Sequence, residues 1–288
     1  MEFLKLPEFK NIFDQKITDF FENLNLKSHL KDPLFYYIEN GGKRLRPWII
    51  YNFGQIVSAN KKNLMDIAIA IEILHSSSLI HDDLPALDNA KLRRGGPANH
   101  LKFGEYKALL AGDYGFTLPL QIVAKLDNIN EGNKLLLMDY FIKTILKLFQ
   151  GEMEDLIFEK EDKDVSEKEI LEMYSKKTGA VFGFCFASPF LMTGEVQLAK
   201  EMNIIGTDFG VSFQIFDDLK DLFTTEEEIG KETNKDINKK TLLNFYNYQE
   251  TQIIADNIYR SVLQKLEEIN LKELSQILKE VRKTVETR

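Results

Sequence analysis

Two clusters of aspartates, each after an apolar segment, constrain the fold of this chain more than any other feature. The first is D-D-L-P-A-L-D at 82–88 and the second is D-D-L-K-D at 217–221. Neighbouring carboxylates raise one another's pKa unless a cation lies between them. Hard divalent cations such as Mg²⁺ select carboxylate oxygens. The two clusters therefore predict two helices that face each other across a metal-filled cavity.

The segments that carry these clusters have helical periodicity. Before the first cluster, apolar side chains recur at spacings of three and four, at Leu64, Ile67, Ile71 and Leu74. This pattern predicts an amphipathic helix that carries His75 toward Asp82. In the second cluster, Asp217 and Asp218 precede Asp221 by four and three positions. That spacing predicts that all three carboxylates share one helix face.

Basic side chains accompany the first cluster. Arg93 and Arg94 follow it within one short loop, and the planar guanidinium group suits phosphate oxygens. Upstream, G-G-K-R-L-R-P at 41–47 brings Lys43, Arg44 and Arg46 directly after two glycines, which allow close approach of the backbone to a ligand. Each motif alone is also compatible with a solvated surface. Together with the acids, they indicate a site that binds diphosphate through Mg²⁺.

Composition excludes several classes of protein. The 45 acidic and 37 basic side chains give a net charge of −8, and no basic stripe suggests binding to a nucleic acid. Hydrophobic residues make up 44% of the chain, whereas glycine and proline occupy only 16 and 7 positions. These values favour an all-α protein. A single cysteine, Cys185, excludes an internal disulfide and fits a reducing compartment.

No feature of the 288 residues suggests a domain boundary, a linker or an internal repeat, so we expect a single domain over 1–288. The N-terminal segment carries acids among its apolar residues and does not resemble a secretory signal. No run of 18 apolar residues occurs. We therefore expect a cytoplasmic protein without stable membrane insertion.

The four motifs G-G-K-R-L-R-P, D-D-L-P-A-L-D, R-R-G and F-Q-I-F-D-D-L-K-D resemble, in this order, those of the trans-prenyl diphosphate synthases, and are most similar to the bacterial farnesyl-forming members. The resemblance implies one isoprenoid-synthase bundle of helices around a central cavity. It also implies a Mg²⁺-dependent prenyltransferase, with Mn²⁺ as a substitute. The implied reaction condenses isopentenyl diphosphate with dimethylallyl or geranyl diphosphate. Members of this family commonly form homodimers.

The resemblance assigns roles to individual residues. Metal binding is implied for Asp82, Asp88 and Asp217, with Asp83, Asp218 and Asp221 in support. The diphosphate of isopentenyl diphosphate is implied to contact Lys43, Arg46, His75 and Arg94, beside Gly42. The allylic diphosphate is implied to contact Arg93, Lys177, Lys231 and Lys240. Lys239 is an alternative to Lys240 as a ligand of the allylic diphosphate. Thr178 and Gln214 are implied to present oxygens to the allylic cation.

One departure and one open choice accompany this resemblance. Glu152 stands where the family commonly has glutamine. Product length is implied to depend on Ser78 and Ser77, four and five positions before Asp82, which lie about 6 to 7.5 Å beneath the metal site on a helix. Small residues there permit a long tail, whereas the spacing of the first cluster also fits bacterial farnesyl synthases. Farnesyl diphosphate is the favoured product and geranylgeranyl diphosphate is the alternative. The floor of the tail channel, meaning the side chains that stop growth of the product, could also be formed by the aromatic residues Phe103, Tyr106 and Phe116.

Two alternatives come from other classes of protein. A class I terpene cyclase also has an acid cluster, but it would have no use for the basic motif at 41–47. A non-catalytic homologue would commonly lack part of the acidic or basic motifs. Elsewhere, Ser166 and Glu169 predict a helix N-terminus with a capping box. The periodic segment from Leu135 to Phe149 predicts a helix with its apolar face in the core.

Overall fold

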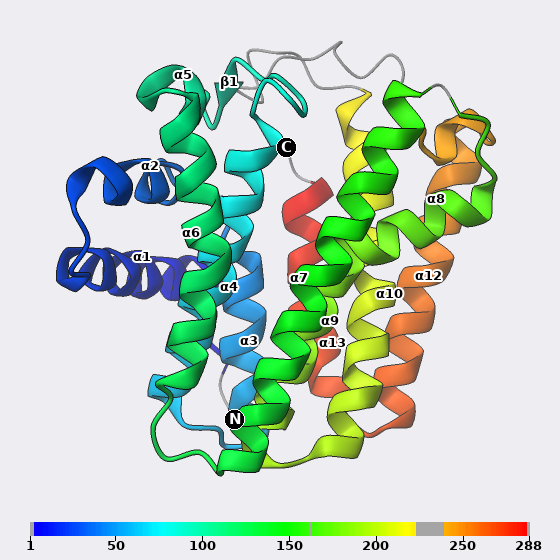
Figure 1. Cartoon of the computed structure of the whole chain (residues 1–288). Helices are drawn as coiled ribbons and strands as arrows, with labels where there is room; N and C mark the ends of the chain where they lie inside the picture. The colour runs from blue at the N-terminus through cyan, green and yellow to red at the C-terminus, as the bar shows by residue number, and fades with distance from the viewer. Residues whose placement is uncertain (1–2, 162, 223–238, 287–288) are drawn as a thin grey trace. The chain divides into compact units, whose positions relative to one another are not determined.

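The computed structural model describes residues 3–161, 163–222 and 239–286, and these form two compact units. The first unit extends to Lys134 and the second begins at Leu135. Helices make up nearly all the regular structure of the described residues, with one short hairpin (Figure 1). The predicted all-α class is confirmed.

The first unit is built around a long buried helix, α4. Leu64, Ile67, Ile71 and Leu74 of α4 are fully buried, as their periodicity predicts, and α4 packs against α3 and α6 (Figure 1). Asn60 caps α4 by accepting a hydrogen bond from the backbone N–H of Asn63. The elements of this unit are α1 (Leu6–Asn23), α2 (Ser28–Glu39), α3 (Leu45–Ile56), α4 (Lys61–Asp82), β1 (Leu92–Arg93), β2 (Gly96–Pro97), α5 (Asn99–Phe103) and α6 (Glu105–Ala124).

The second unit has α9 and α10 at its centre. Every residue of α9 from Ala180 to Met192 is buried. Small residues permit the close approach of these two helices, since a Cβ added at Gly206 would lie 2.7 Å from the carbonyl oxygen of Phe182. The elements here are α7 (Glu131–Lys160, whose first turn belongs to the first unit), α8 (Glu167–Tyr174), η1 (Ser175–Gly179), α9 (Ala180–Thr193), α10 (Val196–Asp221), η2 (Leu242–Asn244), α12 (Tyr248–Glu268) and α13 (Lys272–Glu286).

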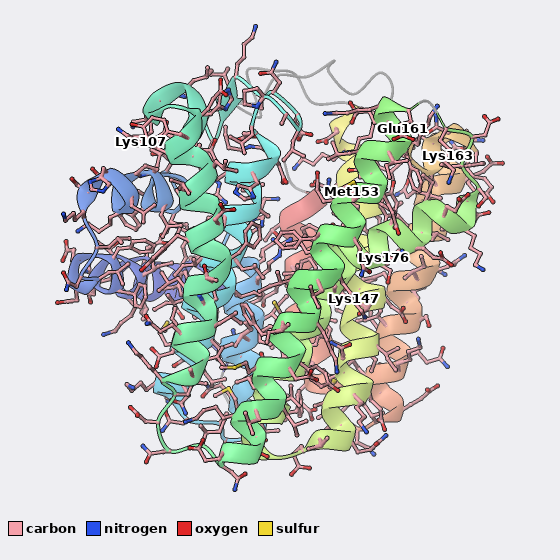
Figure 2. The ribbon with its side chains drawn as sticks, in the orientation of Figure 1. Lys107, Lys147, Met153, Glu161, Lys163 and Lys176 are labelled. Carbon is pink, nitrogen blue, oxygen red and sulfur yellow. The ribbon has the colours of Figure 1, made fainter. Side chains whose placement is uncertain are left out.

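On the apolar face of α7 that was predicted to be buried, Ile145 is buried, but Leu135, Ile142 and Phe149 are exposed in this chain. Leu135 is 68% exposed, and Met153, labelled in Figure 2, is 61% exposed. The exposed stripe follows helical spacing through Leu135, Ile142, Leu146, Phe149 and Met153. The prediction was wrong for this face because periodicity identifies an apolar stripe but not what covers it.

Two smaller predictions are confirmed. Ser166 caps α8, and the backbone N–H of Ser166 donates to the Glu169 carboxylate, which completes a capping box. Cys185 is buried within α9.

One helix of the described residues, α4, is long and apolar enough to cross a membrane by length and composition alone. Of its most apolar window, 67% is buried inside the protein, which is also the behaviour of a core helix in a soluble protein.

Candidate active site

The first acid cluster begins where α4 ends. Asp82 is the last residue of α4, and the backbone N–H of Asp88 donates to the carbonyl oxygen of Asp82 at 2.9 Å. This bond closes the intervening loop and returns Asp88 to the helix end. Asp82 is partly exposed and Asp88 is exposed. The structure thus brings together two of the predicted metal-binding carboxylates.

Asp83 has a different position from its two neighbours in the cluster. Its side chain is fully buried, accepts a hydrogen bond from the Tyr37 hydroxyl at 2.5 Å, and accepts others from the Arg93 guanidinium, whose Nε lies 3.0 Å from Oδ1. With both oxygens occupied in this way, Asp83 is not an outward ligand. The prediction that it supports metal binding directly is corrected to a role in holding Arg93.

Arg94 lies at the tip of the β1–β2 hairpin. Its φ of 53° is in the left-handed region, and its guanidinium donates to the carbonyl oxygens of Tyr37 and Gly41. Gly42 has a φ of 151°, which a residue with a side chain rarely adopts, and a Cβ there would lie 3.2 Å from Arg44 Nη1 and 3.4 Å from Arg94 Nη2. Arg94 therefore ties the hairpin to the glycine-rich loop.

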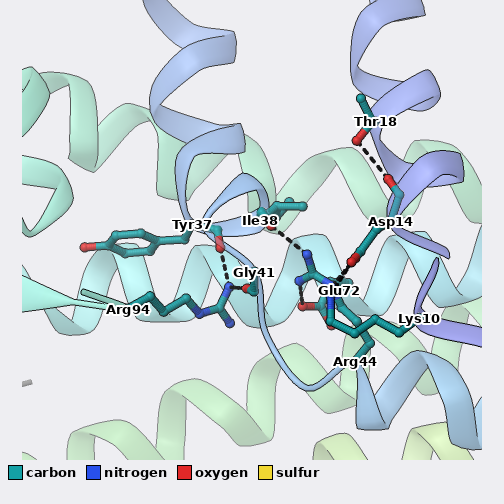
Figure 3. A network of polar contacts seen from close by, with 9 residues as sticks. All are labelled: Lys10, Asp14, Thr18, Tyr37, Ile38, Gly41, Arg44, Glu72 and Arg94. Carbon is teal, nitrogen blue, oxygen red and sulfur yellow. Dashed lines mark hydrogen bonds and ion pairs between the residues drawn. The ribbon is translucent and has the colours of Figure 1, made fainter. Parts of the chain in front are cut away.

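Arg44, within the same basic motif, is a structural residue (Figure 3). It is only 4% exposed, and its guanidinium donates to Asp14 at 2.7 Å, to Glu72 at 2.6 Å and to the carbonyl oxygen of Ile38 at 2.6 Å. The sequence motif alone does not separate Arg44 from its basic neighbours Lys43 and Arg46. An acid inside the apolar α4 segment, Glu72, was the available signal that a buried cation lies beside it.

His75 lies among the basic side chains of this unit. Removal of its imidazole from water and the charges of Arg46, Arg94, Arg93 and Arg44 hold the pKa of His75 well below its usual range. A neutral imidazole beside several guanidinium groups can donate a hydrogen bond to an anion while the arginines supply the charge. Of the predicted isopentenyl diphosphate ligands, the structure thus gathers His75, Arg46 and Arg94. Lys43 follows Gly42 and is partly exposed.

The two serines of the predicted product floor differ in environment. Ser77 is fully buried, and a Cβ added at Gly115 of α6 would lie 1.8 Å from its hydroxyl. Ser77 therefore fills the contact between α4 and α6 and does not border open space. Ser78 is partly exposed, and its hydroxyl donates to the carbonyl oxygen of His75. Of the aromatic alternatives, Tyr106 is 67% exposed.

The second acid cluster forms the end of α10. Asp217 is partly exposed and Asp221, the last residue of α10, is exposed. Asp218 is buried, and burial raises its pKa to about 6 against the opposing effects of Lys239, Tyr174 and Gln214. The helix continues to Asp221, so the spacing predicted for the three acids holds. Asp218 differs from the other two because it is buried and accepts a hydrogen bond from the Tyr174 hydroxyl.

A short polar chain leads from Asp218 to Thr178. Gln214 Nε2 donates to Asp218 Oδ1 at 2.9 Å, and Thr178 Oγ1 donates to Gln214 Oε1 at 2.7 Å. Thr178 lies in the π-helical turn η1, a distortion often found at functional sites. Because the Gln214 amide nitrogen donates to the Asp218 carboxylate, the Gln214 amide oxygen faces Thr178. The two residues predicted to present oxygens to a cation are therefore in direct contact.

Lys177, also in η1, is held by two acids of α7. Its ammonium group lies 2.7 Å from Glu152 and 2.6 Å from Asp155. Burial opposes ionisation of Asp155, but the charges of Lys177 and Lys239 outweigh this effect and hold the pKa of Asp155 below its usual range. Sequence reasoning treated Glu152 as an uncertain peripheral position and did not single out Asp155.

The structure describes two of the three remaining lysines that were predicted to bind the allylic diphosphate. The charge of Lys239 acts on both Asp155 and Asp218. Lys240 is partly exposed. Lys231 lies outside the described residues.

The outward carboxylates suit magnesium. Among the described residues, no group of three or more His, Cys, Asp and Glu side chains converges closely enough to hold a metal ion. Each cluster instead offers two outward carboxylates, Asp82 with Asp88 and Asp217 with Asp221. Mg²⁺ is commonly bound through one or two carboxylates and keeps its other positions for water and substrate phosphate oxygens. The oxygen-only donor set fits this ion.

Comparison with known proteins gives consistent results. A family model described as polyprenyl synthetase matches residues 27–281. A farnesyl diphosphate synthase from Haemophilus influenzae is 34% identical over 257 residues, which cover 85% of each chain. A geranylgeranyl diphosphate synthase from Methanosarcina mazei is 35% identical over 203 residues, covering 70% of this chain and 61% of that one. The structure of a geranyltransferase from Helicobacter pylori, complexed with magnesium and isoprenyl diphosphate, is 27% identical, with a TM-score of 0.84 and coverage of 98% and 100%.

Proposed function

The chain belongs to the polyprenyl synthetase family and is a trans-prenyl diphosphate synthase, and we propose that it condenses isopentenyl diphosphate with dimethylallyl or geranyl diphosphate to give farnesyl diphosphate. The observation that carries the proposal is the group of arginines around His75. A diphosphate needs such a group when it is bound apart from the metal ions. A class I terpene cyclase binds no second diphosphate and would not need it.

The proposal assigns metal binding to the outward carboxylates of Asp82, Asp88, Asp217 and Asp221. Bound Mg²⁺, or Mn²⁺ in its place, would neutralise negative charge on the allylic diphosphate and so make it a better leaving group. This assignment is supported by the exposure of these four carboxylates and by their oxygen-only chemistry.

Protein side chains bind the departing pyrophosphate in this proposal. Arg93, which is fixed by Asp83, contacts its oxygens together with Lys177 and Lys239. Lys239 takes precedence over Lys240 because its charge already acts on Asp155 and Asp218, whereas Lys231 is kept on resemblance alone. Lys177 must exchange its contacts with Glu152 and Asp155 for substrate oxygens.

The allylic cation is stabilised and protected from water in the proposed mechanism. Thr178 and Gln214 direct oxygens toward it, and the contact between their side chains supports this pairing. The allylic C–O bond breaks to release pyrophosphate and leave the cation. Lys43, Arg46, His75 and Arg94, beside Gly42, hold isopentenyl diphosphate so that its double bond can attack this cation. The new tertiary cation then loses a proton to the departing pyrophosphate, which restores a double bond. Electrostatic groups that are fixed before the reaction lower its barrier without further reorganisation.

Farnesyl diphosphate is the proposed product and geranylgeranyl diphosphate is the alternative. Relatives of both product lengths match this chain at similar identity, 34% for the farnesyl synthase and 35% for the geranylgeranyl synthase. The choice of the shorter product rests on the spacing of the first acid cluster, which resembles that of bacterial farnesyl synthases. Sizing the chains made from labelled isopentenyl diphosphate tests this choice.

Ser78→Phe is expected to shift the product of the enzyme toward geranyl diphosphate. Ser78 is partly exposed and lies about 6 Å from Asp82 along α4, so an aromatic ring there would occupy space needed by a growing tail. The measurement is chromatography of the labelled products. Ser77→Phe is the contrasting variant, because Ser77 packs on Gly115 and a ring there should lower thermal stability. An unchanged product from Ser78→Phe would place the floor elsewhere.

We also propose that the protein is cytoplasmic and forms a homodimer through the exposed apolar stripe of α7. Several exposed apolar side chains at helical spacing on one helix are more typical of an interface than of a solvated surface. Leu146→Glu should convert a particle of twice the 33.4 kDa chain mass into a monomer in sedimentation equilibrium. Lys147→Glu, at the neighbouring exposed position of α7, should leave the dimer intact. A wild-type protein that sediments as a monomer would contradict this assignment.

A further inference from the structure

In each unit, a buried tyrosine hydroxyl meets the second aspartate of an Asp-Asp pair. The Tyr37 hydroxyl lies 2.5 Å from Asp83 Oδ2, and both side chains are fully buried. The Tyr174 hydroxyl donates to Asp218 Oδ2, and both side chains are again buried. The tyrosines lie 46 and 44 positions before their aspartates, so neither contact follows from local sequence.

The direction of each hydrogen bond is fixed by a second contact. The backbone N–H of Asn99 donates to the Tyr37 hydroxyl at 2.7 Å, so the phenolic proton is directed to Asp83. The backbone of Leu242 makes the corresponding hydrogen bond to the Tyr174 hydroxyl. Burial and the adjacent carboxylate raise the pKa of each tyrosine well above its usual value, so both remain donors.

Each tyrosine thereby joins a helix end to a segment that carries basic residues. Asn99 follows the hairpin that contains Arg93 and Arg94, and Leu242 follows Lys239 and Lys240. In each unit, one tyrosine hydroxyl thus fixes the aspartate at the helix end relative to the segment that carries the basic side chains.

The aspartate fixed in this way orients a further side chain. Asp83 accepts hydrogen bonds from Nε and Nη2 of Arg93, and these two bonds set the plane of the guanidinium group. Asp218 accepts a hydrogen bond from Nε2 of Gln214, and this bond turns the amide oxygen of Gln214 toward Thr178. The first aspartate of each pair, Asp82 or Asp217, remains partly exposed.

We propose that Tyr37 and Tyr174 are positioning residues, which divide each Asp-Asp pair into an outward metal-binding carboxylate and an inward carboxylate that orients Arg93 or Gln214. This inference rests on the proposed prenyl transfer. It predicts different kinetic effects in the two units, because Arg93 acts on the diphosphate whereas Gln214 acts on the developing cation. Tyr37→Phe should therefore affect binding of the allylic substrate, and Tyr174→Phe should affect turnover.

The first test compares Tyr37→Phe with Tyr36→Phe, the adjacent buried tyrosine, whose hydroxyl donates to the carbonyl oxygen of Pro97 at 3.2 Å. Tyr37→Phe should raise KM for the allylic diphosphate about tenfold, since a hydrogen bond to a charged group is lost. KM for isopentenyl diphosphate should change less than about twofold, because Arg94 contacts the backbone carbonyl of Tyr37. Tyr36→Phe should leave both values near wild type. Equal effects of Tyr37→Phe on both substrates, or none beyond Tyr36→Phe, would overturn the proposal.

The second test separates positioning from metal binding. Asp83→Asn should reproduce the KM effect of Tyr37→Phe without raising the Mg²⁺ concentration needed for half-maximal activity, whereas Asp82→Asn should raise that concentration. Tyr174→Phe should lower kcat about tenfold with little change in KM, and Tyr246→Phe, whose hydroxyl contacts Glu167, is its control. An Asp83→Asn variant that behaves like Asp82→Asn would overturn the proposal.

A binding measurement distinguishes this inference from the proposed function. Titration calorimetry with inorganic pyrophosphate requires no turnover and can be applied to wild type, Tyr37→Phe and Tyr36→Phe. Weaker binding by about tenfold in Tyr37→Phe alone would support positioning even if no condensation were found. Wild-type affinity in a folded Tyr37→Phe protein would reject it even if condensation were active. If Tyr37→Phe does not fold, Asp83→Asn takes its place in the same titration.

Discussion

Replacing Asp82 by alanine is expected to lower the turnover of prenyl transfer by about two to three orders of magnitude. Asp82 ends α4 and, with Asp88, supplies the outward carboxylates of the first cluster. Without it, Mg²⁺ loses a ligand and the leaving diphosphate retains more of its charge. Asp217→Ala should have a comparable effect in the second cluster. The measurement is steady-state turnover at saturating Mg²⁺.

The matched control for this prediction is Asp127→Ala. Asp127 is an exposed acid of the first unit that forms an ion pair with the exposed Lys62 at 2.9 Å. An exposed ion pair contributes little because water screens it, so turnover should stay near wild type. Full activity of Asp82→Ala, or activity that persists in excess chelator, would contradict the assignment of these aspartates to metal binding.

Glu72→Leu is expected to cost about 3 to 5 kcal/mol in free energy of unfolding and to lower the melting temperature by about 10 °C. Glu72 and Arg44 are both nearly fully buried and lie 2.6 Å apart (Figure 3). Removal of the carboxylate leaves the guanidinium with Asp14, which is partly exposed, as its remaining acid. Differential scanning calorimetry of wild type and variant measures the effect.

The double variant Arg44→Met with Glu72→Leu provides the control for this prediction. It removes both buried charges, so it should be more stable than Glu72→Leu alone. A Glu72→Leu protein within about 1 kcal/mol of wild type would show that the ion pair does not hold the glycine-rich loop.

Local patterns predicted the elements that carry the site. The burial of Ile67 and Leu74 followed from their spacing, and the end of α4 at Asp82 coincides with the start of the first acid cluster. The positive φ of Gly42 is likewise a conformation that glycine, and few other residues, can adopt. These features depend on neighbours within a few residues, which a single sequence displays.

The different roles of adjacent residues within one motif could not be predicted in the same way. Asp83 differs from Asp82 because Tyr37 and Arg93 lie on other elements. Arg44 differs from the adjacent Lys43 because Asp14 and Glu72 meet it inside the unit. Adjacent residues of like charge acquire different roles from partners that are distant in sequence, and a single sequence does not specify these partners.

The apolar stripe of α7 illustrates a second limit. Ile142 and Phe149 have the spacing of a core face, yet both are exposed in this chain. The burial of apolar surface is favourable whether the cover is the same chain or another copy. Periodicity therefore identifies the stripe, and only the structure distinguishes core from surface.

The most direct test of the account is incubation of the purified protein with labelled isopentenyl diphosphate, geranyl diphosphate and Mg²⁺, followed by chromatographic sizing of the products. The expected product is a labelled C15 chain, and its formation should stop when a chelator is added. A product that is mainly C20 would overturn the assignment of farnesyl diphosphate as product, but the assignment of prenyltransferase activity would still hold. Failure to transfer label into any allylic product at saturating Mg²⁺ would contradict the proposed condensation itself.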